Sequence, residues 1–185
     1  MRVVFIAGMP GSGKSEAVRI FRDHGLSAVN MGDVVRDEAK SRGKPETPES
    51  LGEVSVSLRR EYGEEEIARR CISRIKKELT LGKDVIVEGV RSLEEIKYFK
   101  KNLRAEFYIV AIHSSPLTRY ERLKSRGRGD DPADWETFEK RDLRELGYGM
   151  GSAIALADFM VINEESLENL REKIEDVYRA IMRTE

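Results

Sequence analysis

The chain has 185 residues, a length typical of one domain, and its 36% charged residues sum to a net charge of only −1. A single cysteine excludes an intramolecular disulfide, and with only two histidines it argues against a cysteine/histidine zinc site. The balanced charge gives no support to general nucleic-acid binding, which we therefore rank low as an activity. Glutamine is absent and lysine, arginine and glutamate are abundant, a composition similar to that of proteins from hot environments. We find no secretory leader and no membrane-spanning apolar stretch, so we expect a cytoplasmic protein.

Short apolar runs alternate with helical patterns along the chain. The runs expected to be buried strands are residues 3–7, 27–30, 85–87, 107–112 and 159–162. The stretches expected to be helices are 14–23, 34–41, 64–81, 92–102, 116–125 and 166–182, with Ser92 and Glu95 forming a capping box. Residues 44–51 and 126–134 are rich in glycine, proline and polar residues, and we expect exposed loops there. The alternation predicts an α/β fold with three layers and a parallel sheet of about five strands.

Residues 8–15 read GMPGSGKS and match the phosphate-loop pattern GxxxxGK[ST] in full. The pattern follows a predicted strand and opens a predicted helix, as the motif requires. Lys14 is expected to reach the β- and γ-phosphates, and the Ser15 hydroxyl is expected to coordinate magnesium. The sequence therefore predicts that ATP or GTP binds with Mg²⁺ at Gly8, Met9, Pro10, Gly11, Ser12, Gly13, Lys14 and Ser15.

Residues 30–36 read NMGDVVR and offer a possible acceptor site. The segment resembles that of adenylate kinases and related nucleoside monophosphate kinases in which a Gly-Asp pair precedes a helix bearing an arginine. By that resemblance Arg36 would hold the phosphate of the acceptor, and Asp33 would lie near magnesium or the attacking oxygen. Residues three apart share a face of a helix, which fits this pairing. A capping aspartate and a surface arginine remain the alternative interpretation.

Residues 84–91 read DVIVEGVR, so that a buried strand ends in Glu88 and is followed by Gly89 and Arg91. Ligands bind at the carboxyl ends of parallel strands, where Glu88 could hold a magnesium-bound water. The segment is similar to one in adenylate kinases that supplies an arginine for the acceptor phosphate, and cytidylate kinases have a comparable pattern. The resemblance therefore implies that Arg91 is a second acceptor-phosphate ligand. A helix-capping turn with incidental charges is the alternative.

Six arginines gather on either side of the second predicted loop: Arg119, Arg122, Arg126, Arg128, Arg141 and Arg144. They resemble the short arginine-rich lid that closes over the phosphates in small P-loop kinases. Planar guanidinium groups pair bidentately with phosphate oxygens and would offset charge on the transferred group. Arg126, Arg128 and Arg141 flank the loop and are predicted to be catalytic, together with Lys14 and Asp33. Acidic neighbours such as Glu145 leave a solvated charged helix as the alternative.

The resemblance to the nucleoside monophosphate kinase group runs the whole chain, and is closest to an archaeal branch described as adenylate kinase-related or dephospho-coenzyme A kinase-like. It implies one kinase domain over residues 1–185, with a core at 1–30, 82–125 and 145–185. An acceptor-binding helical insert would occupy residues 31–81 and a short lid residues 126–144. Ile162 and Asn163 would lie beside the donor base. The chain departs from adenylate kinases at Met31 and lacks their adenine-reading glutamine, and it lacks the distinctive histidine of dephospho-coenzyme A kinases.

The leading hypothesis is a kinase that transfers the γ-phosphate of ATP to a small nucleotide acceptor. A nucleoside monophosphate needs no base, whereas the hydroxyl of dephospho-coenzyme A would need one, and Asp33 is the candidate. An ATPase switch or assembly factor with an RNA or protein partner is an alternative from another class. A kinase of nucleic-acid 5′ ends ranks lower because the chain has no basic excess. The acceptor, the preference between ATP and GTP and the oligomeric state stay open.

Overall fold

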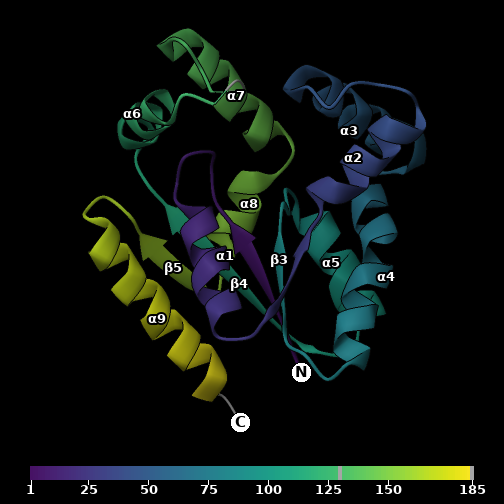
Figure 1. Cartoon of the computed structure of the whole chain (residues 1–185), viewed down its shortest axis with the longest axis vertical. Helices are drawn as coiled ribbons and strands as arrows, with labels where there is room; N and C mark the ends of the chain where they lie inside the picture. The colour runs from purple at the N-terminus through teal and green to yellow at the C-terminus, as the bar shows by residue number, and fades with distance from the viewer. Residues whose placement is uncertain (129–130, 184–185) are drawn as a thin grey trace.

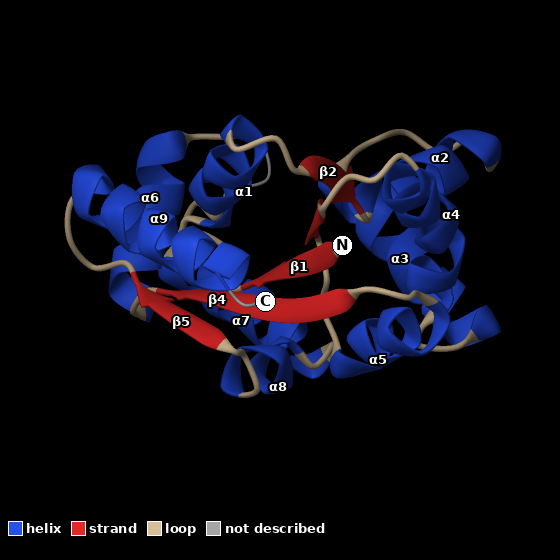
Figure 2. Cartoon of the chain, turned by 90° about the horizontal axis from the view of Figure 1, so that it is seen from below, coloured by secondary structure: helices blue, strands red, loops and turns tan. Residues whose placement is uncertain are grey.

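The computed structural model describes residues 1–128 and 131–183, whose centre is a parallel sheet covered by helices on both faces (Figures 1 and 2). Its strands are β1 (Arg2–Ala7), β2 (Ser27–Asn30), β3 (Val85–Glu88), β4 (Glu106–His113) and β5 (Phe159–Ile162). They lie in the order β2-β3-β1-β4-β5, and every neighbouring pair is parallel. The expected α/β fold with a five-stranded parallel sheet is confirmed.

The described helices are α1 (Lys14–Asp23), α2 (Gly32–Ser41), α3 (Pro48–Tyr62), α4 (Glu66–Thr80), α5 (Leu93–Asn102), α6 (Pro116–Arg126), α7 (Trp135–Gly147), α8 (Met150–Ala155) and α9 (Leu167–Arg183). Alternate residues of β1 face the two helical layers, as expected for a strand buried on both sides. Val4 and Ile6 pack in the core beneath α1 and α9, whereas Val3 and Phe5 pack with α4, α5 and α8. None of these helices is long and apolar enough to cross a lipid bilayer.

The expectation of a loop at residues 44–51 was wrong in its second half, where α3 begins. The Thr47 hydroxyl accepts a hydrogen bond from the Ser50 amide at 3.3 Å, and proline stands in the first turn. Proline fits there because its missing N–H would have no partner in a helix anyway. Proline, serine and threonine therefore marked a helix start, not a loop. Helices α7 and α8 were not among the predicted helices, whereas the capping box of Ser92 and Glu95 is confirmed.

The second expected loop, residues 126–134, lies between α6 and α7, and Gly129 and Asp130 within it lie outside the described residues. In Figure 1, α6 and α7 stand above one side of the sheet's upper end, and α2 and α3 stand above the other. That upper end carries the carboxyl ends of the strands, which is where ligands bind in parallel sheets.

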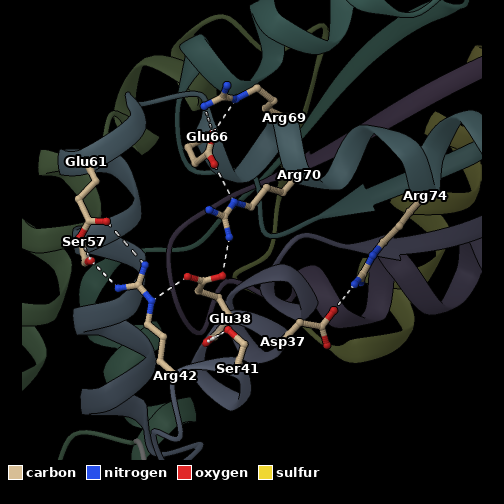
Figure 3. A network of polar contacts seen from close by, with 10 residues as sticks. All are labelled: Asp37, Glu38, Ser41, Arg42, Ser57, Glu61, Glu66, Arg69, Arg70 and Arg74. Carbon is tan, nitrogen blue, oxygen red and sulfur yellow. Dashed lines mark hydrogen bonds and ion pairs between the residues drawn. The ribbon is translucent and has the colours of Figure 1, made fainter.

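Helices α2, α3 and α4 are joined by a network of ion pairs (Figure 3). Glu38 of α2 accepts a hydrogen bond from Arg42 Nε at 2.7 Å and also pairs with Arg70 of α4. Arg70 Nε reaches Glu66 at 2.6 Å, and Arg42 Nη1 donates to Ser57 of α3 at 2.8 Å. The hydrogen bonds from Arg42 and Arg70 lower the pKa of Glu38 below its usual range. Such networks stabilise more at high temperature, where removing charges from water costs less.

Candidate active site

The loop between β1 and α1 has a backbone that only glycine adopts without strain. Gly8, Gly11 and Gly13 have φ angles of 147°, 81° and 103°. A Cβ on Gly8 would lie 2.5 Å from the Ile112 carbonyl oxygen, and one on Gly13 would lie 2.5 Å from Asn163 Nδ2. Because Gly13 provides no side-chain cap, the first amides of α1 stay available to an anion.

Lys14 folds back over this loop. Its Nζ donates hydrogen bonds to the carbonyl oxygens of Gly8 at 2.8 Å and Met9 at 3.0 Å. The pKa of Lys14 is lowered to about 8, mainly by burial. The Glu145 carboxylate acts in the opposite direction and raises this pKa, whereas nearby arginines, first among them Arg91, lower it. The ammonium is thus held at the loop by weak neutral acceptors, which a phosphate oxygen could replace with a stronger partner.

The far side of the loop is anchored to the ends of β4 and β5. Asn163 Nδ2 donates to the carbonyl of the buried Ser12 at 2.9 Å. Ser114 Oγ donates to the Asn163 carbonyl at 2.5 Å, and Arg122 Nη1 of α6 donates to the same oxygen at 3.1 Å. These bonds set the position of the phosphate loop against the sheet.

Arg119 ties α7 to the same loop. Its guanidinium makes two parallel bonds to Asp142 of α7, at 2.8 and 2.5 Å, and Nη1 also donates to the Pro10 carbonyl at 3.2 Å. Its guanidinium carbon lies 5.0 Å from the centre of the Phe138 ring, so the charge is stacked as well as paired. Arg119 is almost wholly buried and therefore acts as a structural link between the phosphate loop and the helix that carries Arg141.

Two cavities of about 660 Å³ each open above the carboxyl ends of the strands. The first, called here the P-loop cavity, is lined by the glycine loop, Lys14, Ser15, Arg122, Arg126, Arg128 and Asn163. The second cavity lies between α2, α3 and α7 and is lined by cationic side chains among others, namely Arg36, Arg59, Lys140 and Arg144. Both cavities are lined by Gly89, Arg91, Arg141 and Glu145, which form a shared wall.

The shared wall is held by an ion pair between Arg91 and Glu145, with Arg91 Nε 3.4 Å from Glu145 Oε2. The Glu145 side chain is only 8% exposed, whereas that of Arg91 is 37% exposed. The Arg91 guanidinium also lies 5.6 Å from the centre of the Tyr148 ring, and its backbone N–H donates to Glu95 at 2.8 Å. With Arg141, the wall therefore presents two positive groups and one negative group between the two cavities.

Comparison with known sequences decides the family. UPF0200 protein MJ1399 of Methanocaldococcus jannaschii is 50% identical over 182 residues, spanning 98% of this chain and 91% of that protein. The chain belongs to the UPF0200 family. UPF0200 protein PYRAB09750 of Pyrococcus abyssi is 44% identical over 181 residues, spanning 97% of both chains. The sequence profile of a family described as AAA domain matches residues 7–139.

The fold of this UPF0200 protein is that of P-loop kinases. TT1252 from Thermus thermophilus superposes with a TM-score of 0.64 at 16% identity, covering 97% of both chains. The dephospho-CoA kinase from Campylobacter jejuni gives 0.63 at 14% identity over 98% of both chains. The shikimate kinase from Bacteroides thetaiotaomicron gives 0.60 at 13% identity, over 97% of this chain and 98% of that enzyme. The resemblance to this kinase group is thereby confirmed at the level of the fold.

The UPF0200 structure brings most of the predicted site residues to the two cavities, while their roles stay predictions. Lys14, Ser15 and the glycines of the loop line the P-loop cavity, and Met9 and Ser12 are buried behind it. Arg36 lines the second cavity and Arg91 lines both. Asn163 also lines the P-loop cavity, whereas Ile162 is not among its lining residues and is exposed.

The three predicted lid arginines, Arg126, Arg128 and Arg141, line the P-loop cavity and gather around Asp131. Arg126 Nε lies 3.0 Å from this carboxylate, the Arg128 amide 2.9 Å, and Arg141 Nη1 3.9 Å. The hydrogen bond from Arg126, more than any other contact, lowers the pKa of Asp131 below its usual range. The carboxylate occupies the kind of position among the arginines that a phosphate group would take.

The two predicted acidic residues lie apart from the cavities. Asp33 pairs with Arg36 in the first turn of α2, and its Oδ2 lies 3.5 Å from Arg74 Nη1 of α4. Glu88 ends β3, where its carbonyl accepts the Met31 amide at 2.9 Å. Among the residues that the structure describes, those lining the two cavities include neither Asp33 nor Glu88.

The lining residues that were not among the predicted site residues include Glu145, Arg122 and Arg144. A usable signal existed for Arg122, because residues 119, 122 and 126 are spaced three and four apart and share one face of α6. For Glu145 the sequence offered only nearby arginines, which is the usual setting of a surface carboxylate. Its position on the shared wall follows from how α7 packs.

The site fits a magnesium ion held mainly by the nucleotide. Within residues 1–128 and 131–183, no group of three or more acidic, histidine or cysteine side chains is placed to hold a metal. Magnesium in phosphoryl-transfer sites takes one or two protein oxygens and completes its shell with phosphates and water. The exposed Ser15 beside the phosphate loop suits this role, and Glu88 at the neighbouring strand end would act through water. When bound, the ion would neutralise phosphate charge.

Proposed function

We propose that this UPF0200 protein is a phosphotransferase that uses ATP and Mg²⁺ to phosphorylate a small nucleotide-type acceptor. The shared wall between the two cavities is the observation that carries the proposal. A triphosphate in the P-loop cavity, with its terminal phosphate near Lys14, would face the second cavity across Arg91 and Arg141. Catalysis would come from aligning the two substrates and offsetting charge, as in other phosphoryl-transfer enzymes.

The charge of the second cavity supports an anionic acceptor. Its cationic lining residues are Arg36, Arg59, Arg91, Lys140, Arg141 and Arg144, and its acidic ones are Glu46, Glu49, Asp131 and Glu145. Arg144 forms no ion pair with any of the described residues, so its guanidinium group is free to bind an anion. Nucleoside monophosphates and dephospho-coenzyme A are both acceptors of this kind. The fold likeness to the Campylobacter jejuni dephospho-CoA kinase adds support for testing the latter.

The proposal assigns a task to each part of the chain. Residues 1–30, 82–125 and 145–185 form the core that binds ATP or GTP, and residues 31–81 form the insert that shapes the second cavity. Residues 126–144 act as a lid. In this role Arg126, Arg128 and Arg141 would exchange the Asp131 carboxylate for phosphate oxygens when nucleotide binds. The acceptor phosphate or another anionic group would be held by Arg36 and Arg91.

The test is to incubate the purified protein with ATP·Mg and a panel of acceptors at elevated temperature and measure the ADP formed. The panel holds every ribo- and deoxynucleoside monophosphate, dephospho-coenzyme A and a control without acceptor. We expect strong stimulation by one acceptor, no turnover by Lys14→Met, and loss of turnover with EDTA. Slow ATP hydrolysis at a rate that no small acceptor changes would contradict the proposal and support an ATPase switch with an RNA or protein partner.

A further inference from the structure

The carboxylate on the shared wall differs in kind from the other acidic groups nearby. Glu145 lies in the last part of α7 and is buried, yet it lines both cavities. Glu46 and Glu49 line only the second cavity and are exposed. Asp131 is held by Arg126 and by the amide of Arg128. Among the described lining residues, Glu145 is thus the one carboxylate placed where the two substrates would meet.

Asp33, the residue that sequence resemblance offered as a base, is differently engaged. One of its carboxylate oxygens pairs with Arg36 and the other with Arg74. Both of its oxygens therefore have cationic partners, and its side chain is not among those that line the cavities. A base must come within hydrogen-bond reach of the proton that it removes. By this criterion Glu145 is better placed than Asp33.

A buried carboxylate at the point of transfer also discriminates between kinds of acceptor. A phosphate oxygen brought against Glu145 would place two like charges together in a poorly solvated site, which is unfavourable. An alcohol, in contrast, would donate its O–H to the carboxylate and gain a charge-assisted hydrogen bond. The ion pair with Arg91 at 3.4 Å keeps the Glu145 carboxylate oriented along the wall.

We propose that the acceptor group is an alcohol hydroxyl and that Glu145 is the catalytic base that takes its proton. The inference rests on the proposed function and narrows its substrate class to an alcohol carrying an anionic group elsewhere, which Arg36 and Arg144 would hold. The hydroxyl proton passes to a Glu145 carboxylate oxygen while the hydroxyl oxygen bonds to the γ-phosphorus. The bond from that phosphorus to the β–γ bridging oxygen breaks, and ADP leaves with its electron pair. The proton on Glu145 then passes to water.

The first arm of the test identifies the bond that is made. The wild-type protein is incubated with ATP·Mg and, separately, ribonucleosides, ribonucleoside 5′-monophosphates and dephospho-coenzyme A, and the products are read by ³¹P NMR. A nucleoside monophosphate carries both a phosphate and hydroxyl groups, so the product shows which of the two the enzyme phosphorylates. We expect a new phosphomonoester signal. ADP gives phosphoanhydride doublets in every case, so the result that would overturn the inference but keep the proposed function is a diphosphate of the acceptor formed beside that ADP. Hydrolysis alone with every compound would overturn both.

The second arm tests Glu145 itself. Glu145→Gln keeps the size of the side chain but removes the basic oxygen, so we expect kcat to fall by about 10²–10⁴-fold with little change in acceptor KM. Glu139→Gln, an exposed change on the same helix, is the matched control and should leave both constants unchanged. Thermal melting and ATP titration establish that both variants are folded and bind nucleotide.

Two outcomes of this arm would overturn the assignment. If Glu145→Gln raises acceptor KM and leaves kcat unchanged, Glu145 positions Arg91 and removes no proton. If Asp33→Asn abolishes transfer while Glu145→Gln retains it, Asp33 is the base. Partial activity in Glu145→Asp, with kcat between those of wild type and Glu145→Gln, would support the assignment, because the shorter side chain keeps a carboxylate at the wall.

Discussion

Glu95 joins three parts of the fold through one buried carboxylate. Its side chain is fully buried and accepts Arg59 Nη2 of α3 at 2.8 Å. The second oxygen accepts the Arg91 amide at 2.8 Å and the Ser92 amide at 3.3 Å, the latter closing the capping box of α5. Replacing Glu95 with alanine would therefore remove a cap and leave the Arg59 guanidinium, 5% exposed, with the exposed Glu64 at 4.0 Å as its remaining counter-charge among the described residues.

The size of the effect follows from the Arg59 charge, which is then largely orphaned, because Glu64 is exposed and lies at the limit of an ion pair. Removing one partner of a buried ion pair destabilises proteins by about 3–5 kcal/mol, because the remaining charge stays out of water. Loss of the cap acts in the same direction and costs about 0.5–2 kcal/mol in other helices, although the two effects share one side chain and do not simply add. We therefore expect Glu95→Ala to lower the free energy of unfolding by at least about 3 kcal/mol.

Urea unfolding followed by far-UV circular dichroism measures this change. Glu94→Ala is the matched control, because Glu94 is the neighbouring residue on α5 and is 54% exposed. Within the described part of the chain it pairs only with Lys97, at 3.3 Å. Loss of such an exposed pair should cost less than about 1 kcal/mol. The double variant Glu95→Ala/Arg59→Met should regain part of the stability, since the orphaned charge is gone. Equal stabilities for Glu95→Ala and Glu94→Ala would refute this reasoning.

Three further predictions concern the site. ATP affinity should fall by up to about tenfold per pH unit above pH 8. Without nucleotide the pKa of Lys14 is about 8, so its ammonium charge is present below pH 8 and lost above it, and bound phosphates would raise that pKa. A calorimetric titration that shows constant affinity from neutral to alkaline pH would contradict this. Arg91→Ala should raise acceptor KM while leaving the dissociation constant of ATP unchanged, and unchanged acceptor kinetics would remove that role. Gly13→Ala should abolish ATP binding and lower the melting temperature, because its φ of 103° and the contact with Asn163 leave no room for a Cβ; a variant that still binds ATP would show that the loop tolerates a side chain.

Local patterns were enough to predict the central architecture. Strands β1 and β3 are short β-branched runs buried on both faces, so their positions could be read from neighbouring residues alone. The phosphate loop is likewise one contiguous segment, in which glycine is required by the φ angles of Gly8 and Gly13 themselves. Where a local pattern had two meanings the prediction failed, as at residues 48–51, because proline and serine suit a loop and the first turn of a helix equally.

What the sequence determined by itself is the class of site: a parallel sheet that presents a phosphate loop and arginines at one end. Which acidic residue lines both cavities was decided only by the tertiary structure. Asp33 and Arg74 are brought together by the packing of α2 on α4, and Glu145 and Arg91 by the contact of α7 with the segment that follows β3. Both pairings join residues far apart in the chain, where a charge has many candidate partners and spacing carries no information about which it meets. Long-range packing selects among them because burying a charge is tolerable only where an opposite charge already lies.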